Sequence, residues 1–255
     1  MRTKLERLWA TKTKHDEWWS SFVTSPLAIA ANYMVVDLLW LTPNRITALS
    51  FLAAVIGTVC IVVGGTENFV LAAILIHVSH ILDCMDGQMA RYRKTSSAAG
   101  SYFDKLTDQV QVTLWFGAIG YAAYALSGDV VPVFLAFVGV AFYGLRGYAK
   151  YVAIQTEMAR DPSYLAQQAE TDGLPELAGL TFGWRANIRW FISEQRKILE
   201  FNEGVFIFML SLALVLNELT FMLWIFAASQ LFYGVCRAIR HGFQINRKSR
   251  AAIQK

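Results

Sequence analysis

The sequence contains little charge and few cysteines, and both shortages limit what the chain can be. Charged residues make up 16% of its 255 residues, whereas hydrophobic residues make up 55%. A soluble domain has about 25% charged residues, so this composition excludes an ordinary soluble protein and indicates a membrane protein. The three cysteines, Cys60, Cys84 and Cys236, are widely spaced and include no CxxC pair. They predict reduced thiols rather than a disulfide framework.

The sequence also lacks an internal repeat, a low-complexity tract and the apolar core of a cleavable signal peptide near its start. We therefore predict a single helical membrane domain over residues 1–255. Residues 1–45 form its N-terminal segment, and residues 155–203 form its one long hydrophilic insert.

Six apolar runs predict six transmembrane helices, because a span needs about 20 mostly apolar residues. The runs cover residues 46–64, 69–85, 106–126, 130–152, 204–216 and 220–239. The first, third and fifth connections contain no Lys or Arg, and all 23 of these residues fall within 1–45, 91–105, 146–197 and 237–255. Cytoplasmic segments carry the Lys/Arg excess, so both termini are predicted to face the cytoplasm. The net charge of +4 then reflects topology and affinity for anionic lipid headgroups, not nucleic-acid binding.

Two segments outside these runs are predicted to form helices that lie in the membrane interface. Ser25 and Pro26 are suited to cap and open the first, which ends before Pro43 and is too short to span. Asp37 lies in its apolar part, and we expect its side chain to reach water. The second covers residues 184–199 of the insert, with apolar and Arg-rich faces; a lid over a substrate site is the alternative.

Four aspartates, Asp83, Asp86, Asp104 and Asp108, lie between two apolar runs. Ionisable residues at such positions are costly and mark functional sites. The first two share one helical face and the last two share another, and the short connection between the helices lets the two pairs face each other. An all-oxygen carboxylate site suits Mg²⁺ or Mn²⁺, and two such ions can clamp a phosphoryl group. A structural cluster neutralised by nearby Arg and Lys is the alternative.

His77 and His80 precede Asp83 on the same helical face. Imidazole suits softer ions than a carboxylate site does, so both are predicted to be packed or hydrogen-bonded rather than metal ligands.

The segment reads Asp83-x2-Asp86-Gly87-x2-Ala90-Arg91-x8-Gly100-x3-Asp104-x3-Asp108. It resembles the signature of the CDP-alcohol phosphotransferase family, integral membrane enzymes of phospholipid synthesis. The resemblance implies an all-α fold with six transmembrane helices and an N-terminal interfacial helix. It also implies a homodimer in a bacterial inner membrane, with a cytoplasmic active site.

The resemblance further implies a role for each signature position. Asp83, Asp86 and Asp104 would ligate two Mg²⁺ ions, and Asp108 would lie near the second ion as general base. Residues implied to bind the nucleotide are Gly87, Ala90, Arg91 and Gly100, with Asn44 and Thr47 as further candidates.

The implied reaction moves a substituted phosphoryl group from a CDP-alcohol, most commonly CDP-diacylglycerol, to a small polar acceptor and releases CMP. The reverse arrangement, in which a lipid alcohol attacks CDP-choline or CDP-ethanolamine, uses the same motif. An acceptor such as inositol phosphate or glycerol phosphate would need cations near the site. The candidates are Arg146, Lys150, Arg237 and Arg240, although positive-inside placement predicts cations there too.

Two other classes of protein also place acidic residues in a membrane bundle. A divalent-cation transporter would hold them near the bilayer midplane on broken helices. An aspartate-rich prenyltransferase would carry two separated aspartate motifs, whereas this chain has one compact motif.

Overall fold

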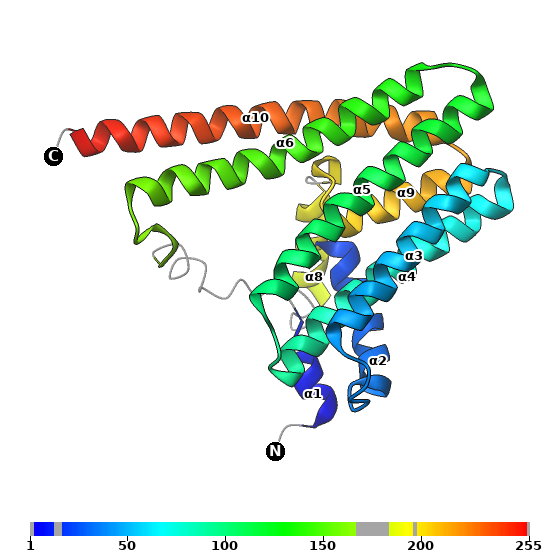
Figure 1. The fold of residues 1–255 in the computed structure, drawn as a ribbon, viewed down its shortest axis with the longest axis horizontal. Helices are drawn as coiled ribbons and strands as arrows, with labels where there is room; N and C mark the ends of the chain where they lie inside the picture. Colours follow the sequence, from blue (N-terminus) through cyan, green and yellow to red (C-terminus); the bar gives the residue numbers. More distant parts are fainter. Residues whose placement is uncertain (1–2, 13–16, 167–183, 196–197, 254–255) are drawn as a thin grey trace.

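The computed structural model describes residues 3–12, 17–166, 184–195 and 198–253, and the regular elements within them are all helices (Figure 1). In chain order they are α1 (Lys4–Trp9), the π-helical turn η1 (Ser20–Thr24), α2 (Ser25–Val35), α3 (Pro43–Val63), α4 (Thr66–Arg93), α5 (Ala98–Ser127), α6 (Val131–Arg160), α8 (Trp184–Gln195), the 3₁₀ turn η2 (Ile198–Glu200), α9 (Glu203–Leu216) and α10 (Leu219–Ile253).

The six apolar runs of the sequence fall in α3, α4, α5, α6, α9 and α10. By length and composition, four described helices are long and apolar enough to cross a membrane: α3, α4, α6 and the 219–247 part of α10. Helix α5 has 30 residues but a more polar N-terminal third, and the apolar α9 has only 14. The chain is therefore an all-helical integral membrane protein, and the count of six spans stays a prediction.

The long helices form two groups that share α5 (Figure 1). Helices α6 and α10 pack along each other and extend beyond the bundle as a two-helix arm. Helix α5 contacts both α6 and α3, while α4 packs against α3 on one side and α9 on another. The core where these helices meet is aromatic: Phe116 and Phe226 stack with ring centroids 3.6 Å apart, and Trp115 and Phe206 pack beside them.

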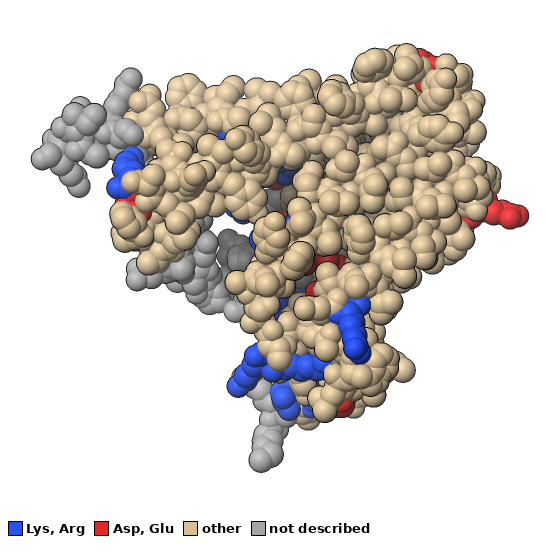
Figure 2. Space-filling view, in the orientation of Figure 1, with Lys and Arg blue, Asp and Glu red and all other residues tan. Residues whose placement is uncertain are grey.

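The outer faces of the long helices expose large apolar side chains. Phe134 and Phe137 of α6 are 63% and 70% exposed, and Val63 of α3 is 68% exposed. Figure 2 shows a broad uncharged surface over this part of the molecule, with Lys and Arg gathered at the end that holds α1 and the α4–α5 connection. Exposed apolar faces of this extent are unusual in a soluble monomer and are expected where helices face lipid.

A short connection joins the end of α4 to the start of α5, as the sequence predicts. Lys94 ends α4 with a positive φ of 57°, and the Ser97 hydroxyl caps α5 by accepting from the Gly100 N–H at 3.0 Å. The two helices are not packed along each other, however: α5 packs mainly against α3 and α6, and α4 against α3 and α9.

The start of α2 differs from the prediction. Ser25 does not cap a free helix end, because its N–H already donates to the Ser20 carbonyl inside η1 and the helical backbone runs on into α2. Helix α2 also ends earlier than predicted, at Val35, so Asp37 lies beyond it. The Asp37 carboxylate pairs with Lys4 at 2.5 Å and is 72% exposed, which matches the expectation that it reaches water.

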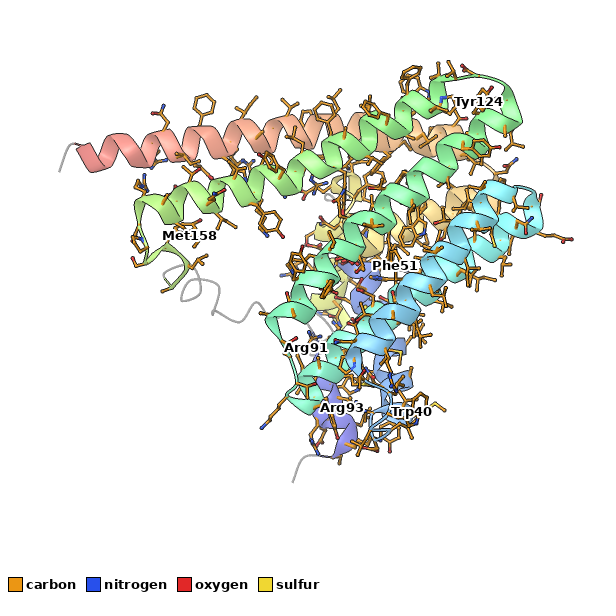
Figure 3. All side chains as sticks on the ribbon, in the orientation of Figure 1. Trp40, Phe51, Arg91, Arg93, Tyr124 and Met158 are labelled. Atoms are coloured by element: carbon orange, nitrogen blue, oxygen red, sulfur yellow. The ribbon has the colours of Figure 1, made fainter. Side chains whose placement is uncertain are left out.

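Arg93 binds the backbone that follows α2. Its guanidinium donates to the carbonyls of Val36, Leu38 and Leu41, at 2.6 to 3.0 Å. Carbonyls at a helix end need such partners. Figure 3 shows Arg93 beside Trp40 at this end of the molecule, opposite Tyr124.

The hydrophilic insert begins as a continuation of α6, which runs to Arg160 rather than ending near residue 152. Residues 167–183 of the insert lie outside the described residues, which resume at 184 with α8. Helix α8 packs on the N-terminal segment, with Phe191 against Trp18 and Trp190 against Phe22. Its Ile188 and Ile192 are at least half exposed, so its placement in the membrane interface stays a prediction.

Candidate active site

Three of the four aspartates come together. Asp83 on α4 and Asp104 and Asp108 on α5 each offer a carboxylate oxygen, and these three atoms lie within 4.8 Å of one another. The helical spacing within α5 puts Asp104 and Asp108 on one face, and the packing of both α4 and α5 against α3 brings Asp83 toward them. The predicted facing of the two helices is thus confirmed for three of the four residues.

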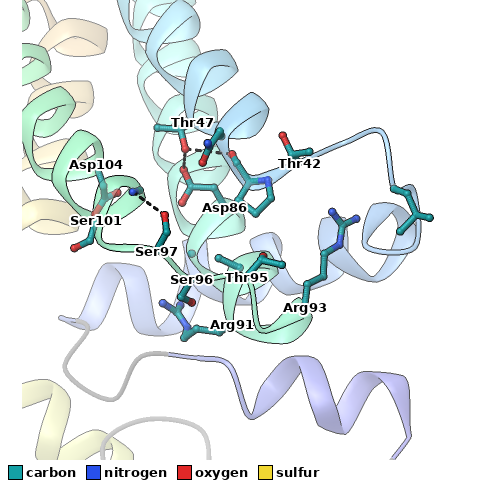
Figure 4. A pocket seen from close by; sticks show the side chains of 16 residues that line it. Thr42, Thr47, Asp86, Arg91, Arg93, Thr95, Ser96, Ser97, Ser101 and Asp104 are labelled. Atoms are coloured by element: carbon teal, nitrogen blue, oxygen red, sulfur yellow. Dashed lines mark hydrogen bonds between the residues drawn. The ribbon is translucent and has the colours of Figure 1, made fainter.

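Asp86 lies beside this group but turns toward α3. Its carboxylate accepts a hydrogen bond from the Thr47 hydroxyl. Figure 4 shows this contact at the wall of a cavity of about 590 Å³, which Asp104 also lines. Asp86 and Asp104 therefore face a common space although their carboxylates do not belong to one tight group.

The 590 Å³ cavity collects every residue implied to bind a nucleotide. Its lining includes Asn44, Thr47, Gly87, Ala90, Arg91 and Gly100. At Gly87 a Cβ would lie 3.1 Å from Nη1 of Arg91, so the glycine leaves room for this guanidinium. Arg91 Nε donates to the Thr11 carbonyl at 2.7 Å, which ties the signature arginine to the N-terminal segment.

A second cavity, of about 840 Å³, opens on the other side of α5. Asp108 and Glu203 line it together with three of the four cations considered for an acceptor phosphate, Arg146, Lys150 and Arg237. Arg240 instead lines a neighbouring cavity of about 390 Å³, which also contains Lys150 and Arg237.

Arg146 is buried and has a structural task as well. Its Nη1 donates to the side-chain oxygen of Gln230 at 2.7 Å and to the Glu200 carbonyl. These bonds hold α6, α10 and η2 together beneath the second cavity.

Glu203 is a further site residue, which was not predicted from the sequence. It begins α9, and its carboxylate lies with Asp83 and His80 in a second group of ligand atoms within 4.8 Å of one another. Glu203 is a carboxylate at the start of an apolar run, so the argument that singled out the four aspartates also applies to it.

The two histidines differ in their surroundings. His77 is packed against Trp19, and its Nδ1 bonds with the Ala73 carbonyl and the Ser211 hydroxyl, both at 3.0 Å, as predicted. His80 is also hydrogen-bonded, through Nε2 to the Ser20 hydroxyl at 2.9 Å, yet it adjoins the acidic group.

The N-terminal segment reaches this region through Glu17. Its carboxylate accepts from the Ser20 hydroxyl, and the two residues line a further cavity of about 370 Å³ with Asp83, Asp86 and Asp104. Burial raises the pKa of the Glu17 carboxyl above its ordinary value, and the Ser20 hydrogen bond opposes that rise.

The acidic group has the donor chemistry of a divalent cation site. Oδ1 of Asp83 is buried, and it has no hydrogen-bond partner among the described residues. Within the same residues, no Lys or Arg forms an ion pair with Asp83, Asp104 or Asp108. Converging carboxylates repel one another, and a hard cation removes that repulsion. The residues therefore fit a divalent metal ion better than a cluster neutralised by basic side chains.

Comparison with known proteins places the signature in a family. The profile of the CDP-alcohol phosphatidyltransferase family matches residues 40–174, about half of the chain. Cholinephosphotransferase 1 of Xenopus laevis is 31% identical over 150 residues, which cover 54% of this chain and 37% of that protein.

Two further relatives carry other names. CDP-diacylglycerol–serine O-phosphatidyltransferase of Helicobacter pylori (strain J99 / ATCC 700824) is 36% identical over 105 residues, 36% of this chain and 43% of that protein. A bifunctional IPC transferase and DIPP synthase of Thermococcus kodakarensis is 28% identical over 113 residues, 44% of this chain and 25% of that protein. The chain thus spans less than half the length of each of these three relatives. From the matched profile and the complete signature around Asp83 to Asp108, the chain belongs to the CDP-alcohol phosphatidyltransferase family.

Proposed function

We propose that this protein transfers a substituted phosphoryl group from a CDP-alcohol to the hydroxyl of an acceptor in phospholipid synthesis, with release of CMP. The observation that carries the proposal is the position of the acidic group between two cavities of different chemistry. Asp104 lines the cavity that holds the nucleotide-binding candidates, and Asp108 lines the cavity that holds the cations.

The first cavity supports the nucleotide part of the proposal. Its volume of about 590 Å³ lies within the range of roughly 300–1,000 Å³ for small-molecule sites. Gly87 and Gly100 bring backbone to its wall, while Thr47 and Asn44 supply polar side chains. In the proposed complex Arg91 pairs with the diphosphate, since a guanidinium fits phosphate oxygens.

Asp83, Asp86, Asp104 and Asp108 would hold two divalent ions, Mg²⁺ in the first place and Mn²⁺ as the alternative. Such ions, when bound, offset the charge of the diphosphate and polarise the phosphorus that is attacked. The Thr47 hydroxyl holds the Asp86 carboxylate at the wall of the first cavity, which Asp104 also lines.

Asp108 is the proposed general base, because it faces the second cavity where an acceptor would enter. An alcohol has a high pKa and needs a carboxylate within hydrogen-bond reach to take its proton. The acceptor oxygen then bonds to the β-phosphorus, the bond from that phosphorus to the bridging oxygen breaks, and CMP leaves with the bridging oxygen. The acceptor proton ends on Asp108.

CDP-diacylglycerol is the proposed donor. The exposed apolar faces of α3 and α6 allow acyl chains to stay in lipid while the headgroup reaches the acidic group. Arg146, Lys150 and Arg237 favour a small acceptor that carries a phosphate, such as inositol phosphate or glycerol phosphate. Arg240 would attract the same phosphate from the neighbouring cavity.

A second candidate is the transfer of phosphocholine or phosphoethanolamine from its CDP derivative to a lipid alcohol. The 31% identity to the Xenopus cholinephosphotransferase favours it. An aspartate-rich prenyltransferase is not favoured, since the aspartates form one compact motif.

The proposed membrane placement follows the charge distribution. Helices α3, α4, α5, α6, α9 and α10 supply six spans, α2 lies in the interface, and the termini and acidic group face the cytoplasm of a bacterial cell. A homodimer is the proposed assembly.

The function is tested with the full chain purified in detergent, supplied with Mg²⁺ and CDP-diacylglycerol, and measured by CMP release. The acceptors are glycerol phosphate, inositol phosphate, serine, inositol and choline, and a parallel arm uses CDP-choline with diacylglycerol. We expect CMP release that depends on one acceptor and that EDTA abolishes.

Variants then test the assigned roles. Asp108→Asn should lower the rate by about 10²- to 10⁴-fold, the usual contribution of a general base. Asp129→Asn, in the α5–α6 connection, is the matched control and should leave the rate unchanged. Arg237→Gln should raise the KM for a phosphorylated acceptor only. Normal turnover by Asp108→Asn would refute the base assignment, and absence of CMP release in every arm would refute the function.

A further inference from the structure

The second group of ligand atoms, at His80, Asp83 and Glu203, differs in chemistry from the four-aspartate group. It joins one imidazole nitrogen to two carboxylates, and it shares Asp83 with the first group. Ser20, Glu17 and Glu203 all lie outside the part of the chain that matches the family profile.

The hydrogen bonds around His80 decide which of its nitrogens faces the carboxylates. The Ser20 hydroxyl donates its single proton to Glu17 Oε1, so Ser20 Oγ must accept from His80 Nε2, at 2.9 Å. In a neutral imidazole the proton is then on Nε2 and the lone pair on Nδ1. Nδ1 is the atom that faces Glu203.

The distance between these two atoms fits ligands of one ion. Nδ1 of His80 lies 3.6 Å from Oε1 of Glu203, which is longer than an N–H···O hydrogen bond of about 2.7–3.2 Å. Two ligands that each lie about 2.0–2.2 Å from one metal ion are roughly 3.0–3.6 Å apart. Asp83 contributes the third ligand atom, within 4.8 Å, so a movement of about 1 Å would close the set around an ion.

Two further features resemble those of metal sites. A histidine ligand almost always donates its other ring N–H to a fixed acceptor, and here the Glu17–Ser20 pair provides one. The buried Oδ1 of Asp83, without a hydrogen-bond partner among the described residues, belongs to a carboxylate that both groups share.

The close approach of the N-terminal segment also depends on Gly204, the residue after Glu203. A Cβ at Gly204 would lie 1.9 Å from Glu17 Oε1 and 2.5 Å from Ser20 Oγ. The glycine therefore lets η1 bring Ser20 against His80.

We propose that His80, Asp83 and Glu203 form a further site for a divalent transition-metal ion such as Mn²⁺ or Zn²⁺, which shares Asp83 with the four-aspartate group, with Ser20 and Glu17 holding His80 in the ligating tautomer. A mixed nitrogen and oxygen site accepts these ions readily, whereas Mg²⁺ prefers oxygen ligands and water. The site goes beyond the proposed transfer reaction, which uses the aspartates of the signature.

Pulsed electron paramagnetic resonance of the full chain in detergent, loaded with Mn²⁺ alone, tests the site without substrate. We expect electron spin echo modulation from a directly bound ¹⁴N. It should persist in His77→Gln, the matched control one turn earlier on α4, and disappear in His80→Gln and Glu203→Gln. Ser20→Ala should weaken Mn²⁺ binding by about 10- to 100-fold, as expected when the partner of a histidine ligand is removed.

Wild-type protein that binds Mn²⁺ without ¹⁴N modulation would overturn the proposal, and so would modulation of equal depth in His80→Gln. The wild-type and His77→Gln spectra decide the question even if another variant fails to fold. CMP release without a nitrogen signal would refute this site and leave the proposed reaction standing. A nitrogen signal without CMP release would do the opposite.

Discussion

Gly139 offers a sharp test of how closely α6 and α10 pack. A Cβ added at this residue would lie 2.3 Å from Cδ1 and 2.6 Å from Cε1 of Phe226. Carbon atoms in contact are normally about 3.5–4.0 Å apart, so the ring would have to move by roughly 1.2 Å or more. Phe226 has little room to move, because it is fully buried and stacks on Phe116, with Phe201 against its edge.

The expected cost of Gly139→Ala follows from this overlap. Forcing an extra methyl group into a packed core costs about 1–3 kcal/mol. Replacing a helical glycine by alanine returns at most about 1 kcal/mol. The overlap at Phe226 is large, so we take a cost of about 2–3 kcal/mol, and subtracting about 1 kcal/mol leaves a net loss of roughly 1–2 kcal/mol. This loss corresponds to a melting temperature about 2–8 °C lower, by the scaling for globular proteins of 150–250 residues.

The same substitution should reach the second cavity. Gln230 lies one turn after Phe226 on α10 and holds Nη1 of Arg146 at 2.7 Å. A displaced Phe226 would shift this contact, so we expect a higher KM for the acceptor along with the lower stability.

Thermal unfolding in detergent, followed by size-exclusion chromatography of heated samples, measures the effect. Gly117→Ala is the matched control, because a Cβ added on this exposed face of α5 would meet no described atom within 4 Å apart from its own stretch of helix. Its melting temperature should stay the same or rise slightly. A Gly139→Ala protein that melts at or above the wild-type temperature would refute the packing argument.

Two further predictions concern hydrogen bonds at the end of the bundle near the site. Thr47→Val removes the hydroxyl that donates to Asp86 and should raise the Mg²⁺ concentration needed for half-maximal CMP release by about 10- to 100-fold. Thr58→Val removes a hydroxyl that bonds only within its own helix, so this Mg²⁺ concentration should not change. Equal Mg²⁺ requirements in the two variants would contradict the role of Asp86. Arg93→Gln removes the donors to the carbonyls that follow α2 and should cost about 1.5–3 kcal/mol of stability in the same melting assay, while Arg247→Gln on α10 should leave the melting temperature unchanged.

Local spacing made much of the site predictable from the sequence. Asp104 and Asp108 are four residues apart, so any helix puts them on one face, and the short link from Lys94 to Ser97 keeps the joined ends of α4 and α5 close together. The apolar runs likewise located the long helices. The lack of Lys and Arg in alternate connections predicted which connections lie on the same side of the membrane.

Packing between distant segments was not predictable in this way. Asp86 turns from the other three aspartates because Thr47, 39 residues earlier, offers it a hydroxyl. The helical backbone runs through Ser25 because η1 precedes it, although its sequence suits a cap.

The chain's own order of residues thus determined its membrane character, its helices and the shared face of Asp104 and Asp108, since each depends on neighbours within a few turns. Tertiary structure alone decided that Glu203 joins Asp83 and that Ser20 holds His80, 60 residues away. Contacts between segments so far apart depend on how whole helices pack, and the helical periodicity of a sequence does not indicate which helices will be in contact.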